Sequence, residues 1–237
     1  MFKRNLPNYI TSINLLCGIS AIVSFAYLDD RLRYIPVLVL IGLVADFLDG
    51  FVARITKSAS EIGKQLDSLA DLVTFGVVPG LIAVYFLKSD PFQIEAIESL
   101  NLALLGLLIP VFTAWRLAKF NVDGGNYKHF KGLASPANAI YYVGLIFLPD
   151  SQFSFFIDPI FLVSAVFLLS ALLVSNLPMF NMKFDNFKWK GNEIRFLYLF
   201  VVISLLLFFG LQAISLCIIA YIFMSMINNL FKNEIQS

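Results

Sequence analysis

Four aspartates lie in or beside apolar stretches of the sequence, at spacings that suit helices. Asp46 and Asp49 are three residues apart, and Asp67 and Asp71 are four residues apart. Residues three or four apart share one face of a helix, so each pair projects from a single face. Because only a short segment separates the two helices, these faces can oppose each other. The sequence therefore predicts a cage of carboxylates.

A carboxylate cage at membrane depth needs positive charge within it. One aspartate at the centre of a membrane helix costs roughly 2.5–3.5 kcal/mol on insertion scales, so the set would cost on the order of 10 kcal/mol. Arg54 and Lys64 are nearby, but neither lies at helical spacing from a pair inside a span. Ligation by oxygen alone suits Mg²⁺ or Mn²⁺, and we expect two such ions. The expected metal ligands are Asp46, Asp49, Asp67 and Asp71.

Small residues accompany the predicted cage. Gly50 follows Asp49 directly, Ala53 keeps the same helix surface low, and Gly63 precedes the second pair. A residue without Cβ lets a bulky ligand approach the backbone closely. Two metal ions held by carboxylates form a clamp for phosphoryl chemistry. Together these features predict a ligand that carries phosphate.

The segments that must position these residues have the composition of membrane spans. Of 237 residues, 59% are hydrophobic and 14% are charged, and the mean hydropathy is +0.82. A soluble domain is roughly 45–50% apolar and about 25% charged. We predict an all-α, polytopic integral membrane bundle that forms a single domain over residues 1–237, with about eight transmembrane helices and six to eight possible. The candidate spans are residues 11–28, 34–55, 66–87, 99–119, 134–149, 158–176, 195–210 and 212–230.

Basic residues gather near one set of predicted helix ends. Arg54 and Lys57 follow the second candidate span, and Arg116 and Lys119 end the fourth. Cytoplasmic loops of membrane proteins carry an excess of Lys and Arg. We therefore expect these loops to be cytoplasmic. An even number of spans would place both termini on the same side.

Several other classes of protein are excluded by the composition. The 17 Lys and Arg residues nearly balance the 16 Asp and Glu residues, so the formal charge is +1 and no polycation suggests nucleic-acid binding. Cys17 and Cys217 lie far apart in apolar stretches. A disulfide framework or a zinc site is therefore not expected.

The residues around the aspartates resemble the signature of the CDP-alcohol phosphotransferase superfamily, D-x2-D-G-x2-A-R-x8-G-x3-D-x3-D. All fixed positions match, and they are Asp46, Asp49, Gly50, Ala53, Arg54, Gly63, Asp67 and Asp71. The resemblance implies that the carboxylates hold two divalent metals and that Asp71 deprotonates the acceptor alcohol. It implies contacts to the CDP moiety from Gly50, Ala53, Arg54 and Gly63.

Further segments resemble the integral-membrane phosphatidylserine synthase branch of that superfamily. These segments are residues 6–11, 14–18, 65–71, 75–79, 116–121 and 130–136. Ala134 departs from the branch, which usually has proline there. The resemblance favours nucleotide contacts for Asn8 and Thr11, and helix capping is the alternative.

The resemblance to this branch implies a reaction, partners and a location. The reaction is transfer of the phosphatidyl group from CDP-diacylglycerol to L-serine, which releases CMP. The protein is expected to pair as a homodimer among membrane lipids, in the inner membrane of a bacterium, with its active site facing the cytoplasm. A serine hydroxyl needs a positioned base to attack phosphorus, and Asp71 is the candidate.

Alternatives remain open at this point. Glycerol 3-phosphate or inositol phosphate could be the acceptor, although a second phosphate should demand additional basic residues. A cation or proton transporter also uses buried aspartates. Arg116 is a candidate for binding a lipid phosphate or the serine carboxylate, with attraction to anionic lipid as the alternative. Ser135 is expected to cap a helix, and Lys64 is equally suited to anchoring or ligand contact.

Overall fold

The computed structural model describes residues 2–28, 30, 32–58, 60–88, 102–122, 130–182, 188–189 and 191–236. The elements in chain order are α1 (Phe2–Tyr27), α2 (Ile35–Thr56), α3 (Glu61–Leu72), the π-helix η1 (Val73–Val77), α4 (Val78–Lys88), the 3₁₀ helix η3 (Leu102–Leu107), α5 (Leu108–Val122), β1 (Phe130–Lys131), α6 (Ser135–Leu145), the 3₁₀ helix η4 (Ser154–Ile157), α7 (Pro159–Val174), β2 (Pro178–Met179), α8 (Glu193–Phe209), the 3₁₀ helix η5 (Gly210–Ala213) and α9 (Ile214–Gln236).

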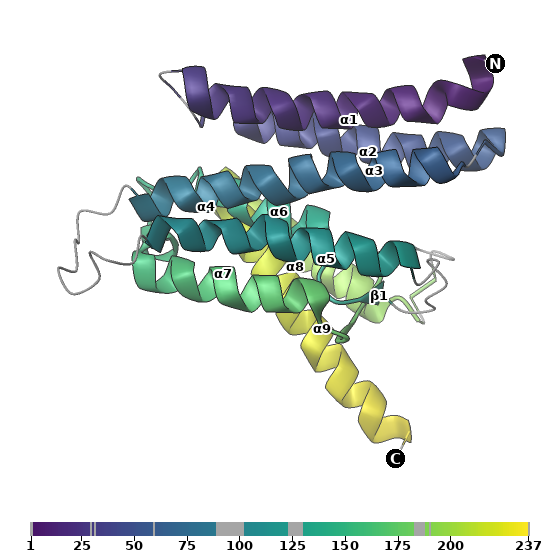
Figure 1. The fold of residues 1–237 in the computed structure, drawn as a ribbon. Helices are drawn as coiled ribbons and strands as arrows, with labels where there is room; N and C mark the ends of the chain where they lie inside the picture. The colour runs from purple at the N-terminus through teal and green to yellow at the C-terminus, as the bar shows by residue number, and fades with distance from the viewer. Residues whose placement is uncertain are drawn as a thin grey trace.

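The helices form a layered bundle in which α3 and α4 lie between two other groups (Figure 1). On one side α1 and α2 pack against each other, and α1 also contacts α3. On the other side α5 packs against α7, and α5 contacts α3. The motif residues on α2 and α3 therefore face a space that α1 closes.

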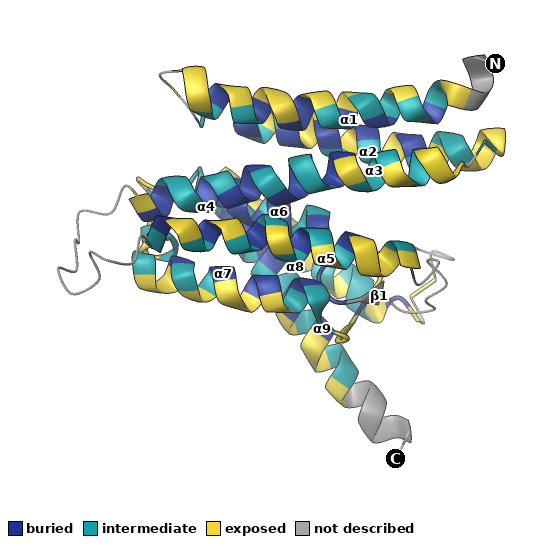
Figure 2. Cartoon of the chain, in the orientation of Figure 1, coloured by how far each residue is buried: buried dark blue, intermediate teal, exposed yellow. Residues whose placement is uncertain are grey.

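Many outward-facing side chains of the bundle are apolar, as a hydrocarbon environment requires. Exposed and buried positions alternate along α1 and α2 at helical spacing (Figure 2). Leu40 and Phe47 of α2 are exposed, whereas Val39 and Asp49 are buried. Helices satisfy their backbone hydrogen bonds internally, which allows them to lie in lipid. The prediction of an all-helical, polytopic membrane protein is confirmed.

The predicted number of spans is wrong. Within the described residues, five helical stretches are long and apolar enough to cross a membrane, namely Asn5–Tyr27, Ile35–Thr56, Glu61–Lys88, Leu102–Val122 and Glu193–Leu230. The candidates at 134–149 and 158–176 became α6 and α7, which have 11 and 16 helical residues. At about 1.5 Å per residue these reach about 17 and 24 Å, short of roughly 30 Å of hydrocarbon. The last two candidates form one helical stretch through η5.

The stretch from α3 to α4 carries half of the motif and changes its helical type in the middle. Ser60 caps α3 by accepting a hydrogen bond from the Gly63 backbone nitrogen at 3.1 Å. The π-helical turn η1 begins at Val73, two residues after Asp71. Single π turns inside helices occur frequently at functional sites. This helix therefore has a defined start before the aspartates and an irregularity directly after them.

A short β pairing, which the sequence did not predict, joins the segments before α6 and after α7. Phe130 pairs with Met179 and Lys131 with Pro178, antiparallel. Gly132 follows with φ of 72°, and a Cβ there would lie 2.7 Å from the carbonyl oxygen of Leu172. Only glycine suits this conformation and this contact. The pairing sets where the chain enters α6.

Candidate active site

Three of the four predicted carboxylates converge between α2 and α3. One side-chain oxygen from each of Asp46, Asp49 and Asp67 lies within 4.8 Å of the others. Asp49 is buried, and the other two are partly buried. We call Asp46, Asp49 and Asp67 the carboxylate group. For these three residues, the prediction that the acidic faces of the two helices oppose each other is confirmed.

Asp71 lies one helical turn beyond Asp67 and is more deeply enclosed. It is buried, and its Oδ1 accepts a hydrogen bond from Nδ2 of Asn14 at 3.1 Å. Asp71 therefore lies outside the set of three converging carboxylates, and a side chain of α1 holds one of its oxygens.

The first helix contributes a second donor to the site. The hydroxyl oxygen of Thr11 lies 2.5 Å from Asp49 Oδ2 and 3.0 Å from the carbonyl oxygen of Pro7, so its single proton is shared between these two acceptors and the contact to Asp49 is the shorter. Thr11 and Asn14 are three residues apart and share a face of α1. Because α1 begins at Phe2, neither Asn8 nor Thr11 caps it, and the capping alternative is wrong.

Sequence reasoning missed the contribution of Asn14. The residue was part of a matched segment, but no role followed from it. The available signal was its spacing from Thr11, which places both side chains on the face of α1 that meets the acidic helices.

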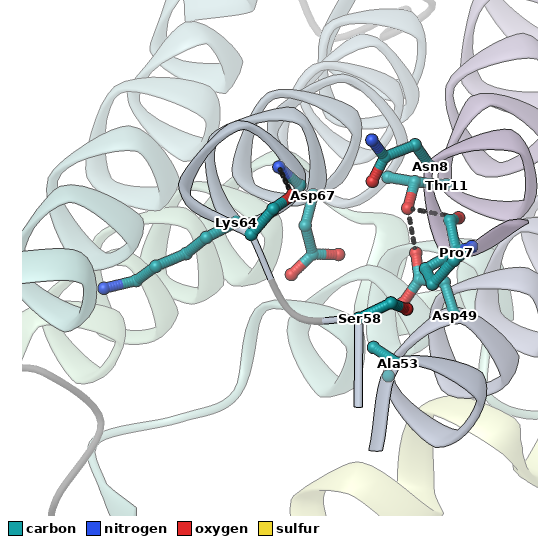
Figure 3. Close-up of a pocket in the computed structure, with 11 residues that line it drawn as sticks. Pro7, Asn8, Thr11, Asp49, Ala53, Ser58, Lys64 and Asp67 are labelled. Atoms are coloured by element: carbon teal, nitrogen blue, oxygen red, sulfur yellow. Dashed lines mark hydrogen bonds between the residues drawn. The ribbon is translucent and has the colours of Figure 1, made fainter. Parts of the chain in front are cut away.

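A pocket of about 220 Å³ opens beside the carboxylate group (Figure 3). It is lined by Pro7, Asn8, Thr11, Asp49, Gly50, Ala53, Ser58, Ser60, Gly63, Lys64 and Asp67. A Cβ on Gly63 would lie 2.8 Å from Asn8 Oδ1, whereas a Cβ on Gly50 would meet nothing within 4 Å. Gly63 thus lets α1 approach α3, and Gly50 keeps open the space that a ligand would need.

The structure brings together all but one of the predicted nucleotide contacts. Asn8, Thr11, Gly50, Ala53 and Gly63 line the same pocket. Arg54 is exposed and is not among the residues that line it. A contact between Arg54 and a nucleotide stays a prediction.

Lys64 connects two helices at the edge of the pocket. Its side chain extends away from Asp67 and Asn8 (Figure 3), and its Nζ donates to the carbonyl oxygen of Asn121 at 2.8 Å. The Asn121 amide donates in turn to Ser68 Oγ at 2.8 Å. The ammonium group of Lys64 therefore ties α3 to the end of α5.

A basic side chain of α5 contacts the start of α6. Nη1 of Arg116 donates to Ser135 Oγ at 3.0 Å. Ser135 is fully buried and is the first residue of α6, whose cap position is Ala134. The expectation that Ser135 caps the helix is wrong, because its hydroxyl instead accepts from Arg116.

The carboxylate group fits a divalent cation. Its donor atoms are all oxygens, which hard cations prefer. Oδ1 of Asp67 is buried and has no hydrogen-bond partner in the described part of the chain. Leaving a buried carboxylate oxygen unpartnered is costly, and a cation would relieve that cost.

Comparison with known proteins decides the family. The CDP-alcohol phosphatidyltransferase family matches residues 4–175, which run from the first turn of α1 to the end of α7 and include the whole carboxylate group. The chain belongs to this family. The resemblance found in the sequence is thereby confirmed, and the roles of individual site residues stay predictions.

Three relatives that are similar over most of the chain share the name CDP-diacylglycerol–serine O-phosphatidyltransferase. The protein of Helicobacter pylori is 32% identical over 233 residues, which make up 95% of this chain and 91% of the relative. That of Bacillus subtilis is 34% identical over 189 residues, or 79% of this chain and 94% of the relative. That of Methanocaldococcus jannaschii is 32% identical over 221 residues, which make up 92% of this chain and 91% of the relative.

Proposed function

We propose that the protein transfers the phosphatidyl group of CDP-diacylglycerol to L-serine, giving phosphatidylserine and CMP. The observation that carries the proposal is the carboxylate group of α2 and α3, which lies beside a glycine-lined pocket in a membrane-spanning chain. Three relatives are named for this activity, and each is similar to this chain over most of its own length and most of this chain. Their names support serine as the acceptor.

Asp46, Asp49 and Asp67 would hold divalent cations, Mg²⁺ or Mn²⁺. Asp71, which the resemblance also gives as a ligand, lies one helical turn beyond Asp67 and outside this group of three. Bound cations supply positive charge, which neutralises the two phosphates of the donor and makes phosphorus more electrophilic. The hydrogen bond from Thr11 orients Asp49, so that this carboxylate does not have to be ordered when a ligand binds.

The CDP moiety of the donor would occupy the pocket beside the carboxylate group. Gly50 and Ala53 offer little side-chain bulk on α2, and Gly63 does the same on α3. Asn8 and Thr11 supply polar groups from α1. This arrangement supports the five residues as nucleotide contacts, and Arg54 joins them only if the cytidine reaches beyond the pocket.

Asp71 would act as the base. The serine hydroxyl oxygen attacks the phosphorus nearest the lipid, a new P–O bond forms, and the bond from that phosphorus to the oxygen of CMP breaks. The hydroxyl proton passes to Asp71 as the new bond forms. The leaving CMP keeps the electron pair of the broken bond.

Arg116 supports an acceptor that carries a single anionic group. It is a partly buried basic side chain of α5 whose Nη1 donates to Ser135 Oγ, and the proposal assigns its positive charge to the carboxylate of serine. Guanidinium groups match carboxylates in shape and charge. Glycerol 3-phosphate or inositol phosphate would bring a doubly charged phosphate, which favours more than one basic side chain.

The site would face the cytoplasm of a bacterium, at its inner membrane. Arg54, Lys57 and Lys64 lie at the ends of α2 and α3 beside the site, and Lys119 lies near the end of α5. Such an excess of basic residues is typical of the cytoplasmic side. A homodimer stays a prediction that rests on the resemblance alone.

A cation or proton transporter would account for buried aspartates but not for the glycine-lined pocket.

The deciding experiment measures CMP release by the purified protein in detergent, with CDP-diacylglycerol and Mn²⁺. Serine, glycerol 3-phosphate, inositol and inositol phosphate are offered in parallel. We expect release with serine. CMP release with another acceptor but not with serine would overturn the assignment of serine as the acceptor. No release with any of the four would favour a transporter.

A further inference from the structure

Asn14 occupies an unusual position for an amide in a membrane helix. It is fully buried on α1, and its Nδ2 donates to Asp71 Oδ1 at 3.1 Å. An ionised carboxylate only accepts hydrogen bonds, so the amide must present its NH₂ group to Asp71. The contact therefore has a fixed direction.

The backbone of Asn14 is tied to the same helix as its side chain. Thr74 lies three residues after Asp71 in the π turn η1, and its hydroxyl donates to the carbonyl oxygen of Asn14 at 2.9 Å. Thr74 is fully buried. Two hydrogen bonds thus join one residue of α1 to the chain at Asp71 and just beyond it.

Close packing holds this junction in place. A Cβ on Gly18 would lie 2.5 Å from Thr74 Oγ1, and a Cβ on Gly42 would lie 3.0 Å from Asn14 Oδ1. The glycines therefore let α1 and α2 approach the π turn. Because atoms surround Asn14 so tightly, its amide has little freedom to leave Asp71.

The other end of the amide indicates that packing alone does not explain the residue. Oδ1 of Asn14 is buried and has no hydrogen-bond partner in the part of the chain that the structure describes. An unpartnered buried oxygen costs free energy that a leucine of similar shape would avoid. The hydrogen-bonded half of the amide is its Nδ2, so the bond to Asp71 is what this side chain has and a leucine would lack.

We propose that Asn14 is a positioning residue, which holds Asp71 by Oδ1 so that Oδ2 faces the acceptor hydroxyl. This inference rests on the proposed function, in which Asp71 is the base. The terminal torsion of an aspartate is soft, so a free carboxylate samples a broad range of orientations. A base must lie within about 2.6–3.2 Å of the oxygen whose proton it takes. Fixing one oxygen keeps the other at that distance.

Thr11 makes the same kind of contact one turn earlier on α1. It orients Asp49, a proposed metal ligand, and Asn14 orients Asp71. One face of α1 thus sets the orientation of carboxylates from both acidic helices. Losing the Thr11 contact should weaken metal binding, whereas losing the Asn14 contact should slow the reaction itself.

The test substitutes Asn14→Leu, which keeps the branched shape and removes the donor, and Asn14→Ala, which removes the whole amide. Ser24→Ala is the matched control, because Ser24 is also buried on α1 and its hydroxyl donates to the carbonyl oxygen of Ala21 on its own helix. Serine-dependent CMP release gives kcat and KM, and Mn²⁺ binding and CDP binding are measured separately on the same preparations.

We expect both Asn14 variants to lower kcat about 10-fold or more, with Mn²⁺ and CDP affinities within about 2-fold of the wild type. Ser24→Ala should keep kcat. An unchanged kcat in either folded Asn14 variant would overturn the inference. So would a loss of kcat that is matched by a loss of CDP and Mn²⁺ binding, because that pattern indicates a structural role. If Asn14→Leu does not fold, the kinetics of Asn14→Ala decide the question. If neither variant folds, Thr74→Val is measured instead, because it removes the hydrogen bond to the Asn14 backbone. The inference then requires a lower kcat with unchanged CDP affinity, and any other result contradicts it.

The wild type separates this inference from the function on which it rests. A wild type that binds CDP and Mn²⁺ but releases no CMP with serine contradicts the proposed function. A wild type that releases CMP, alongside Asn14 variants that do so equally fast, contradicts only the role of Asn14.

Discussion

The N-terminal helices α1 to α5 and the C-terminal helices α8 and α9 are both apolar, but they differ in what their polar side chains contact. In the first region side chains of α1 reach carboxylates on other helices, as Thr11 does with Asp49 and Asn14 with Asp71. In the second region, the hydroxyls of Ser215 and Tyr221 donate instead to backbone carbonyl oxygens, those of Tyr141 and Phe180.

Within the second region, α8 also differs from the other long helices in burial. α8 has no buried residue, and the family match ends at residue 175, before this helix begins. A helix that is apolar all round and exposed in the bundle suits contact with lipid. From this difference we expect the chemistry to lie where three helices bring acids and donors together, and α8 to supply membrane surface.

The largest effect is expected when the carboxylate group loses charge. The double substitution Asp46→Asn with Asp49→Asn removes two proposed metal ligands from α2 and should lower serine-dependent CMP release by about 100-fold or more. Asp158→Asn is the control, because Asp158 is exposed at the start of α7. Activity within about 10-fold of the wild type would mean that the acids of α2 are not part of the site.

Replacing Asp71 should separate binding from turnover. Asp71→Asn keeps the shape and can still bond to Asn14, but it cannot take a proton. We expect kcat to fall about 100-fold or more, with CDP affinity close to that of the wild type. The measurement pairs kinetics of CMP release with binding of CDP in the presence of Mn²⁺. Equal losses of kcat and of CDP affinity would contradict a role as base.

The two glycines of the pocket should respond differently to a methyl group. Gly63→Ala places a Cβ 2.8 Å from Asn8 Oδ1, whereas Gly50→Ala meets no protein atom within 4 Å. Both should raise the KM for CDP-diacylglycerol several-fold, but only Gly63→Ala should also lower the melting temperature, by a few degrees for about 1 kcal/mol. Thermal unfolding in detergent, read beside the KM, checks this. If Gly50→Ala lowered the melting temperature and Gly63→Ala did not, the assignment of Gly63 to helix packing and of Gly50 to ligand space would be wrong.

The smallest effect is expected on α8. Leu207 and Phe208 are 80% and 81% exposed, so they face the surroundings of the bundle. Leu207→Ala or Phe208→Ala should leave kcat and KM within about 2-fold of the wild type, as surface positions usually do. Loss of most activity in either variant, in folded protein, would show that α8 contributes to the reaction and would remove the contrast between the regions.

The site was more predictable from the sequence than the number of spans. Asp46, Asp49 and Asp67 meet because helical spacing fixes which face each of them occupies, and that spacing can be read directly. Hydropathy could not separate α6 and α7 from full spans, because the apolar sequence of α6 continues into a turn after Leu145, and the apolar run at 158–176 is only slightly longer than α7. The β pairing at Phe130 joins segments far apart in the chain, and no local pattern indicates such a contact.

The role of α1 was predictable only in part. Asn8 and Thr11 could be placed near the nucleotide through matched motifs, but the bond from Asn14 to Asp71 depends on how α1 packs against α3. That packing depends on Gly18, Gly42 and Gly63, whose effect appears only when the neighbouring helices are in place.

The measurement that tests the central claim most directly is binding of Mn²⁺, followed by electron paramagnetic resonance, to the purified protein in detergent. The wild type is compared with a variant that combines Asp46→Asn, Asp49→Asn and Asp67→Asn, with and without CDP. We predict that the wild type binds Mn²⁺, that CDP tightens this binding, and that the triple variant loses it. Equal binding by the two proteins, or no binding by the wild type, would contradict the assignment of the carboxylate group as a metal site.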